Sequence, residues 1–511
     1  MAFDDLLSEL DSRRETALGM GGAEKLARRR ERGLLNARER LERLLDDGAF
    51  FESGLFATSN RAEVAHKTPA DGKIAGFGRV DGRPIGVISN DFTVLGASSA
   101  VINGKKIRHV KETATRRGMP LVMLGESSGA RMPDRMGAAG RAILGQDRYE
   151  YRRLRETPWV SALLGPCYGS STWYSCLSDF VVMRKGALMS VASPRVSELA
   201  ISQPVDPEEL GGWRLHTEVT GLVDLAVDTD EAAVDAIKQF LSYLPSHQNE
   251  PPPVHEVPQG SGDDAARVLE ILPESRTKVY DVRKIIAAIV DRDSSFELKP
   301  RFGRSVATVL TRMNGRTVGF LANNPLSKGG AIDVDACRKV TSFMVLCDSF
   351  NIPIVLLVDQ PGFLIGLDGE KRWAPGRIMN WMNALSLVTV PKIALTLRKN
   401  YGQAYLNMGG GRNADENAAW PSADFGFMDP AVGVNVLHGL RREDDPERFD
   451  ALVREIAQDS SPWSLAALYE AQNVIDPRDT RGFLIDALDV HLDRYRNGVG
   501  EHLLSNWPTS F

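Results

Sequence analysis

Two short loops combine a glycine with residue types that can stabilise a negative charge through the backbone. The first reads GPCYGSS at 165–171 and the second reads KNYGQAY at 399–405, and a helix is expected after each. Such a turn can direct successive N–H groups toward a developing oxyanion, and the start of the helix adds a positive partial charge. Taken alone, each loop is more typical of a plain strand-to-helix turn.

Other catalytic patterns are not found. Serine and cysteine side chains near these loops would suggest a hydrolase, but GxSxG is absent and no histidine has a spacing typical of a triad. HExxH, Walker A and GxGxxG with a following acidic residue are also absent, so metal hydrolysis, nucleotide triphosphates and NAD are not indicated. We expect Glu126 and Asp359 to cap helices or make structural hydrogen bonds rather than to transfer protons. The side chains set aside as nucleophiles are Ser127, Ser128, Cys167 and Ser170.

The two halves of the chain repeat at a constant spacing of 233 residues, and this spacing makes the two loops equivalent. Chance similarity does not hold register over about 90 residues, so we infer a duplicated domain. Two matched oxyanion holes suit a reaction with two carbonyl-type partners. Further along, Asp179-Phe180 is matched to Asp424-Phe425 at a spacing of 245, which predicts about 12 inserted residues in the second half. The pairs at 233 include Lys106 with Lys339, Gly129 with Gly362, Pro158 with Pro391 and Gly169 with Gly402.

The elements that must position the loops are short apolar runs separated by longer helical patterns. The sequence predicts buried strands, with a helix at 98–117 in the first half and at 334–350 in the second. Strand-helix-strand units of this length favour right-handed parallel crossovers, and ligands bind such units at the carboxyl ends of the strands. The predicted strands are 84–88, 120–124, 159–164, 317–322, 353–358 and 392–396.

Length and composition indicate two domains. The chain has 511 residues and 43% apolar residues, and domains of about 200–250 residues are expected for such a chain. Residues 246–264 are rich in proline, glycine and polar residues and predict a linker between domains 1–245 and 265–511. The net charge of −5 gives no indication of nucleic-acid binding.

The sequence also favours a cytoplasmic protein. No apolar run reaches the roughly 20 residues that span a bilayer. The N-terminal segment MAFDDLLSELDSRRE is acidic and lacks the apolar core of a signal peptide. The four cysteines form no CxxC pair and lie in apolar segments, so we expect reduced packing residues; they are Cys167, Cys176, Cys337 and Cys347.

Motifs along most of the chain resemble the carboxyltransferase β subunits of propionyl-CoA, acetyl-CoA and methylcrotonyl-CoA carboxylases. The resemblance covers both halves, and the motifs occur in the family's order. First-half motifs are LNARERLERLLDDGAFFE (35–52), DGKIAGFGRVDGRPIGVISNDFTVLGAS (71–98), SGARM (128–132), DFVVM (179–183) and EELGG (208–212). Second-half motifs are DRDSSFELKPRFG (291–303), DSFNIPIVLLVDQPGFLIG (348–366), TVPKIALTLRKNYGQAY (389–405) and AAWPSADFGFM (418–428).

The resemblance implies an α/β fold of two duplicated crotonase-like (ClpP/crotonase) domains, each a β-β-α superhelix. In the family, the first domain binds the acyl-CoA and the second receives carboxybiotin on a separate carrier protein. The implied reaction moves a carboxyl group from carboxybiotin to the α-carbon of an acyl-CoA through a thioester enolate, without a metal. Family members commonly form homohexamers, as trimers of dimers, whose active sites lie between opposing domains of two chains.

Roles follow from the resemblance position by position. Gly169 and Ser170 would supply N–H groups for the acyl-CoA enolate, and Gln403 and Ala404 would supply those that face the biotin ureido oxygen. The implied substrate-binding residues are Ser128, Gly129, Ala130, Arg131, Tyr168, Gly362, Phe363, Gly402 and Leu406. No Met-Lys-Met motif and no glycine-rich ATP-binding signature is present, so a biotin carboxylase and a biotin carrier are expected as partners.

The chain departs from the family pattern at both loops. Members usually have two adjacent glycines where this chain has Gly169-Ser170, and Gly-Gly-Ala where it has Gly402-Gln403-Ala404. A residue that influences acyl choice in the family is Leu406 here, which predicts an apolar pocket and an atypical acyl group. The sequence therefore leaves two alternatives open. One is a biotin-independent decarboxylase or acyltransferase that acts on a malonyl-type thioester, and the other is a non-catalytic partner of an active paralogue.

Overall fold

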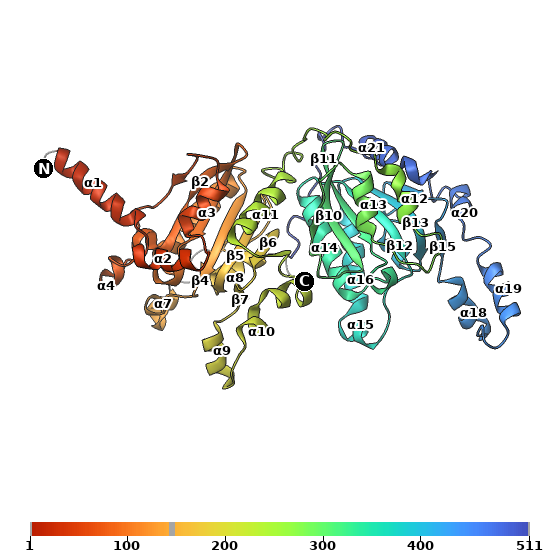
Figure 1. The fold of residues 1–511 in the computed structure, drawn as a ribbon, viewed down its shortest axis with the longest axis horizontal. Helices are drawn as coiled ribbons and strands as arrows, with labels where there is room; N and C mark the ends of the chain where they lie inside the picture. The colour runs from red at the N-terminus through yellow and green to blue at the C-terminus, as the bar shows by residue number, and fades with distance from the viewer. Residues whose placement is uncertain (1–2, 143–148, 509–511) are drawn as a thin grey trace. The chain divides into compact units, whose positions relative to one another are not determined.

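The computed structural model describes residues 3–142 and 149–508 of the 511-residue chain. The chain divides into two compact units, each with its own sheet (Figure 1). The first unit runs to Ser242 and also contains the segment from Asn506, and the second unit runs from Tyr243 to Ser505. Residues 246–264 contain no helix or strand and belong to the second unit.

The first unit is built on a sheet with the order β1-β2-β3-β4-β5-β6-β8, and β7 pairs with the end of β5. β1, β2 and β3 are antiparallel, whereas β3 to β6 and β8 are parallel to one another. The bounds are β1 (Phe51–Glu52), β2 (Lys73–Val80), β3 (Arg83–Asn90), β4 (Leu121–Ser127), β5 (Trp159–Tyr168), β6 (Phe180–Arg184), β7 (Leu188–Ser190) and β8 (Leu225–Val227).

Helices cover both faces of this sheet. Successive side chains of a strand point to opposite faces. On β3, Ile88 packs with α5, while the Ser89 hydroxyl donates 2.8 Å to the Ala37 carbonyl of α3. α3 and α11 lie side by side on the second face (Figure 1). The helices are α1 (Phe3–Leu18), α2 (Ala23–Glu31), α3 (Ala37–Leu44), α4 (Ala62–Ala65), α5 (Val101–Arg116), α6 (Met132–Arg135), α7 (Gly137–Ala142), α8 (Ser170–Cys176), α9 (Pro194–Ile201), α10 (Pro207–Gly211) and α11 (Asp230–Ser242).

The second unit repeats this plan with the sheet order β16-β14-β13-β12-β11-β10-β9, and β15 pairs with the end of β13. Its strands are β9 (Phe296–Leu298), β10 (Val306–Met313), β11 (Arg316–Asn323), β12 (Ile354–Gln360), β13 (Lys392–Tyr401), β14 (Glu416–Ala419), β15 (Asp424–Gly426) and β16 (Asn473–Val474). Its helices are α12 (Val268–Ile271), α13 (Val282–Ile289), α14 (Val334–Ser349), α15 (Leu367–Lys371), α16 (Ala374–Leu387), α17 (Ala404–Asn407), α18 (Pro430–His438), α19 (Pro446–Ile456), α20 (Pro462–Ala467) and α21 (Thr480–Val490).

The predicted elements are confirmed. All six predicted strands coincide with β3, β4, β5, β11, β12 and β13, apart from a leading proline in two of them, and the two predicted helices are α5 and α14. The equivalence of Lys106 and Lys339 also holds in the structure. The Lys106 ammonium donates to the Lys73 carbonyl at the start of β2, and the Lys339 ammonium donates 2.7 Å to the Val306 carbonyl at the start of β10.

The predicted match between Asp179 and Asp424 is wrong. The Asp179 carboxylate accepts 2.9 Å from the Trp159 N–H at the start of β5, and the Asp415 carboxylate accepts 2.7 Å from the Lys392 N–H at the start of β13. Asp415 lies 236 positions after Asp179, so the second half gains three residues here rather than about 12. Asp424 lies in β15 instead, because an Asp-Phe dipeptide occurs in both halves by coincidence.

A spacing of 245 does occur, but upstream of the expected place. The ion pair of Arg38 with Glu52 spans 2.9 Å, and its counterpart of Arg283 with Glu297 spans 2.8 Å. Both members of the second pair lie 245 positions after those of the first. The repeat therefore extends back through α3 and α13, and the first half carries 12 additional residues between β1 and β2.

A buried ion-pair cluster ties the N-terminal helices of the first unit to its sheet. Arg40 is fully buried and donates 2.9 Å to Glu126 at the end of β4 and 2.8 Å to Asp230 at the start of α11. Arg29 of α2 pairs with Glu126 as well, at 2.9 Å. Satisfied pairs of this kind offset the cost of removing charge from water.

A residue near the end of the chain contributes a hydrogen bond to the first unit. The Arg155 guanidinium is buried and donates 2.8 Å to the Trp507 carbonyl, so a segment distant in sequence completes this unit.

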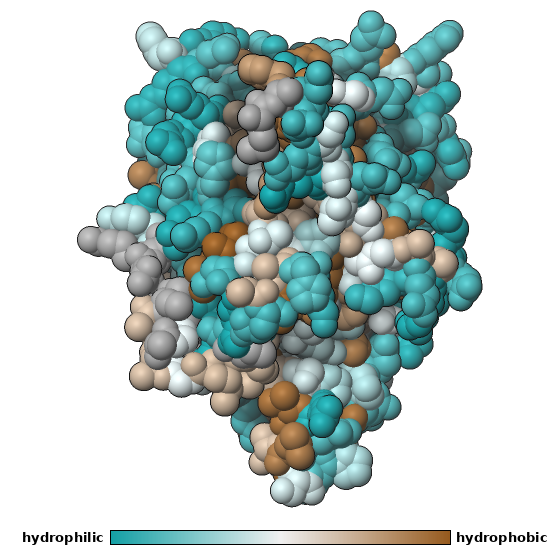
Figure 2. Space-filling view, turned by 90° about the vertical axis from the view of Figure 1, so that its left-hand side faces the viewer, coloured by the Kyte–Doolittle hydropathy of each residue, from teal (hydrophilic) through white to brown (hydrophobic). Residues whose placement is uncertain are grey.

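The surface in Figure 2 is mostly hydrophilic, with hydrophobic residues at its lower tip, where Figure 1 places α9. Three apolar side chains of α9 are more than half exposed; they are Val196, Leu199 and Ile201. Among the described residues, no helix has the length and apolar character that crossing a bilayer requires.

We predict that Arg40→Met destabilises the first unit, because it leaves two buried carboxylates without their shared partner. The free energy of unfolding should fall by about 3–5 kcal/mol. Urea denaturation at a fixed protein concentration measures it. Arg43→Met removes an arginine of the same helix whose pair with Asp235 is exposed, and it should leave stability nearly unchanged. Equal losses in the two variants would contradict the role given to the buried cluster.

Candidate active site

The first glycine loop turns the chain between a buried strand and a helix. β5 ends at Tyr168 and α8 begins at Ser170, so Gly169 alone makes the turn, with φ 65° and ψ −123°. A residue with a Cβ is strained in this conformation, whereas glycine adopts it readily. The turn brings Gly169 next to the segment that follows β4, since a Cβ added at Gly169 would lie 3.8 Å from the Gly129 Cα.

A short parallel bridge fixes that neighbouring segment. The Ser99 N–H donates 2.8 Å to the Gly129 carbonyl, and the Ser99 carbonyl accepts 2.9 Å from the Arg131 N–H, so Ser99 is paired with Ala130. The Ser128 N–H donates 2.8 Å to the Gly96 carbonyl. The structure thus brings Ser128–Arg131 and Tyr168–Ser170 together.

The Arg131 side chain is not free to contact a ligand. Its guanidinium is 5% exposed and donates 2.8 Å to the Asp71 carboxylate and 3.4 Å to the Ser98 carbonyl. Burial raises the pKa of the Asp71 carboxyl, while its hydrogen bond with Arg131 opposes this shift. Arg131 therefore holds the segment from inside, and the part of the segment that lies next to the loop is Gly129.

The second loop has the same construction. Gly402 follows β13, has φ +62° and donates 3.0 Å from its N–H to the Gly426 carbonyl. Ile332 stands where Ser99 stands in the first unit. Its N–H donates 3.1 Å to the Gly362 carbonyl and its carbonyl accepts 2.8 Å from the Leu364 N–H, which pairs it with Phe363. The predicted residues Gly362 and Phe363 are thereby held at the same place in the fold as Gly129 and Ala130.

Both loops present unused backbone donors. Across the described residues, the N–H groups of Gly169, Ser170, Gln403 and Ala404 have no hydrogen-bond partner. Ser170 is the first residue of α8, and Ala404 is the first residue of α17. N–H groups at a helix start have no partner within the helix, and the positive end of the helix favours a negative charge there. The arrangement is suited to binding an anionic oxygen at each loop.

The side chains around the loops differ between the units. In the first unit, the Ser99 and Ser170 hydroxyl oxygens lie 2.6 Å apart. In the second unit, the Gln403 side chain is exposed, Leu406 is partly buried, and the Phe363 ring meets Trp381 edge-on at 6.2 Å. Sequence reasoning did not single out Ser99, although its place 233 residues before Ile332 was readable from the repeat.

A buried acid supports the second loop. The Tyr401 hydroxyl donates 2.6 Å to the Asp424 carboxylate, and Arg276 contacts both groups. Burial, with Asp424 next, raises the pKa of Tyr401 above its usual range. From the other side, the Gln360 amide donates 3.1 Å to the Tyr401 carbonyl. These contacts fix the strand end before Gly402, and no sequence pattern identifies Arg276 as part of this support.

Other groups near the loops have structural contacts. Burial raises the pKa of the Cys167 thiol to about 12, so its reactive thiolate form is scarce at neutral pH. The Ser127 hydroxyl donates 3.2 Å to a backbone carbonyl. Glu126 and Asp359 each form buried ion pairs with arginine, at 2.9 Å to Arg40 and 2.8 Å to Arg398, rather than helix caps. Within the described ranges, no group of three His, Cys, Asp or Glu side chains could hold a metal ion.

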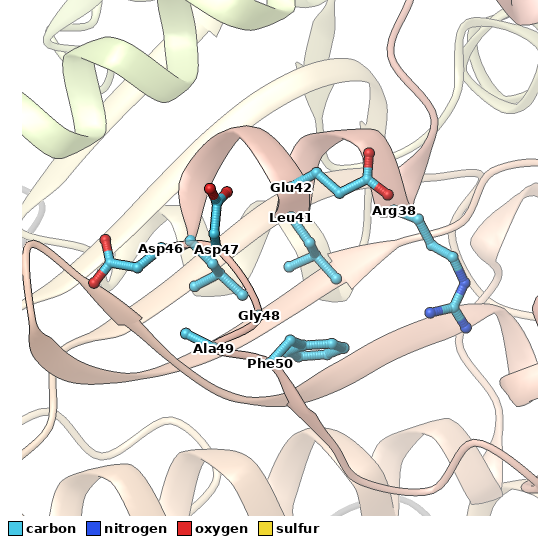
Figure 3. Close-up of a pocket in the computed structure, with 9 residues that line it drawn as sticks. Arg38, Leu41, Glu42, Asp46, Asp47, Gly48, Ala49 and Phe50 are labelled. Carbon is cyan, nitrogen blue, oxygen red and sulfur yellow. The ribbon is translucent and has the colours of Figure 1, made fainter.

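The pocket in Figure 3 is separate from the two loops. It has a volume of about 300 Å³, and none of its lining residues belongs to either glycine loop. Leu41 and Phe50 face each other across it, and Glu42, Asp46 and Asp47 carry its carboxylates (Figure 3). It lies between α3 and the turn into β1 and offers no match to the oxyanion chemistry of the loops.

The fold and the loops define a class of protein: duplicated crotonase-like α/β enzymes with one glycine loop in each unit. The carboxyl transferase domain family matches residues 28–501. The propionyl-CoA carboxylase carboxyltransferase subunit of Haloferax mediterranei is 36% identical in an alignment 502 residues long, which covers 95% of this chain and 96% of that protein. The methylmalonyl-CoA decarboxylase subunit alpha of Veillonella parvula is 31% identical over 93% of this chain and 94% of its own length.

A solved structure is similar over almost the whole length. The hexameric transcarboxylase 12S, with hydrolysed methylmalonyl-coenzyme A bound, is 32% identical, covers 96% of both chains and has a TM-score of 0.88. The chain therefore belongs to the carboxyl transferase domain family, and it is an enzyme of the acyl-CoA carboxylase type.

We predict that Gly402→Ala impairs carboxyl transfer. The added Cβ would lie 3.2 Å from the Phe427 carbonyl oxygen, and the positive φ costs a residue with a Cβ roughly 1–2 kcal/mol. Relief of this strain would rotate the N–H groups of the loop and lower kcat by about tenfold or more, at 1.36 kcal/mol for each factor of ten. Gly439→Ala is the matched control, because Gly439 has φ +61° with nothing within 4 Å. Steady-state kinetics measures both, and equal kcat values would contradict the prediction.

Proposed function

We propose that this chain is the carboxyltransferase subunit that moves a carboxyl group from carboxybiotin to the α-carbon of an acyl-CoA, with the first loop binding the thioester oxygen. The observation that carries this proposal is the pair of equivalent loops, each with a positive-φ glycine and unused N–H donors at a helix start. Two donor sites match a reaction in which two carbonyl-type oxygens gain negative charge.

At the first loop, the N–H groups of Gly169 and Ser170 would bind the thioester oxygen while it becomes an enolate oxygen. Donors that are held in place before the reaction need no reorganisation, and one such donor is worth about 2.7–4 kcal/mol of transition-state stabilisation. The start of α8 adds its positive partial charge. Arg131, Asp71 and the Ser99 bridge keep the segment opposite the loop from moving away.

The second loop fits the ureido group of biotin. A ureido oxygen is a carbonyl-type acceptor, and the N–H groups of Gln403 and Ala404 are two donors without a protein partner among the described residues. When bound, biotin supplies the carboxyl group in activated form. The loop residues hold and orient the ring, while Tyr401 and Asp424 keep the strand end in place.

Assembly and partners belong to the same proposal. Residues 1–245 would bind the acyl-CoA and residues 265–511 the biotin of a separate carrier, with a biotin carboxylase as a further partner in the cytoplasm. The related transcarboxylase 12S assembles as a hexamer, which supports a homohexamer here. Exposed apolar residues on α9 and on its repeat equivalent α18 suit contacts between copies; they include Leu199 and Leu437.

The alternative function is biotin-independent decarboxylation of a malonyl-type thioester. Its support is the replacement of a family glycine by Gln403, whose exposed amide stands where the biotin ring would approach. Both functions would use the first loop for the thioester, so the second loop and its need for biotin separate them.

The discriminating experiment follows malonyl-CoA and methylmalonyl-CoA by mass spectrometry, with the purified chain and no ATP, carrier or biotin. We expect no conversion until biotin carboxylase, biotinylated carrier, ATP and bicarbonate are supplied, when propionyl-CoA becomes carboxylated. Rapid release of acetyl-CoA or propionyl-CoA without biotin would favour the alternative function. No conversion in either reaction would refute both functions.

We also predict that Leu406 selects an apolar acyl group. Leu406→Asp should lower kcat/KM for straight-chain acyl-CoA substrates by about 10-fold or more, since removing an apolar contact is worth about 1–3 kcal/mol. Competition among acetyl-, propionyl-, butyryl- and octanoyl-CoA measures the preference. Leu468→Asp, at a side chain that is 74% exposed, is the control. An unchanged preference in the Leu406 variant would assign acyl choice to other residues.

A further inference from the structure

We propose that the Ser170 hydroxyl is a third donor to the thioester oxygen at the first loop, and that Ser99 holds it in the donating orientation. This inference rests on the proposed function, because it concerns the same oxygen of the same substrate. Members of the family usually have glycine at the position of Ser170, so the hydroxyl is an addition to the two backbone donors of the loop.

The backbone fixes the position of Ser99. Both its N–H and its carbonyl are used in the bridge to Gly129 and Arg131, at 2.8 and 2.9 Å. The side chain of Ser99 therefore extends from a residue whose backbone N–H and carbonyl are both hydrogen-bonded. Its Oγ lies 2.6 Å from the Ser170 Oγ, which is the distance of a good O–H···O hydrogen bond.

The hydrogen count of this pair leaves one donor available. Each serine hydroxyl has one hydrogen and can accept two hydrogen bonds. When Ser99 donates to Ser170, the Ser170 hydrogen is unused, and no other acceptor for it is present among the described residues. Both side chains are only partly buried, so a substrate atom can approach them.

The free hydrogen lies beside the backbone donors of the loop. Ser170 Oγ is linked to its own backbone N through Cβ and Cα, and that N–H is itself unused at the first position of α8. An oxygen that accepts from this N–H is therefore within reach of the hydroxyl. The helix start favours the negative form of that oxygen, and a hydrogen bond to a charged acceptor is roughly twice as strong as one to a neutral acceptor.

The second unit has no such pair of hydroxyl groups at the equivalent positions. Its equivalent positions are Ile332 and Gln403, and an isoleucine cannot hydrogen-bond to the residue after the glycine. The two sites thus differ in the strength with which they bind negative charge. A third donor at the first site suits the thioester oxygen as it becomes an enolate oxygen, whereas the second site relies on its two backbone donors.

The test compares Ser170→Ala with Ser171→Ala, two substitutions of adjacent serines in the same helix turn. Propionyl-CoA carboxylation by the complete system of chain, biotinylated carrier, biotin carboxylase, ATP and bicarbonate is followed at saturating carrier. We expect Ser170→Ala to lower kcat by about 100-fold, since loss of one oxyanion donor has an effect of this size, with KM for propionyl-CoA changed less than about twofold. Ser171→Ala should retain the kcat of the original protein.

Ser99 is a positioning residue, and its variants give a second readout. Ser99→Ala should lower kcat by about tenfold without changing KM, and Ser99→Thr, which keeps the hydroxyl, should restore it. Equal kcat values for Ser170→Ala and Ser171→Ala, or a loss in Ser99→Ala that Ser99→Thr does not restore, would overturn the inference. If the original protein fails to carboxylate any acyl-CoA while its melting temperature is normal, the proposed function fails, and this inference fails with it.

Discussion

Each half of this chain must reverse direction within one or two residues between a buried parallel strand and a short helix. Gly169 and Gly402 do this with φ 65° and +62°, a conformation that other residues adopt only with strain. Because the strand end cannot shift in a packed sheet, the turn decides where the next N–H groups point. The flanking bridges at Ser99 and Ile332, and the buried ion pairs beneath them, serve to hold the surroundings of that turn.

The strands were predictable because central parallel strands are covered on both faces and appear as nearly continuous apolar runs. The segments before Gly129 and Gly362 show this clearly, and their constant spacing also revealed the duplication. The two loops followed from the same repeat. Sequence therefore located the fold and the backbone of the candidate site.

Side-chain contacts were harder to predict from the sequence. The Arg131 guanidinium faces Asp71 in the interior, a contact across 60 positions that no local pattern encodes. Asp424 was matched to the wrong aspartate because dipeptide similarity carries no information about strand pairing. The pair of Ser99 with Ser170 depends on two segments meeting in space, and only the bridge to Ala130 shows that they meet. The sequence thus predicted the positions of residues within one element, but it did not predict which residues of different elements contact each other.

The hydrogen bond from Arg155 to the Trp507 carbonyl has a consequence for synthesis of the protein on the ribosome. Trp507 follows Arg155 by 352 positions, and the whole second unit lies between them. The first unit therefore emerges from the ribosome early but acquires its final backbone partner late. A chain released prematurely after the second unit would keep the ion pair of Arg155 with Asp179 but lack the Trp507 acceptor, so it should be less stable than the full-length chain.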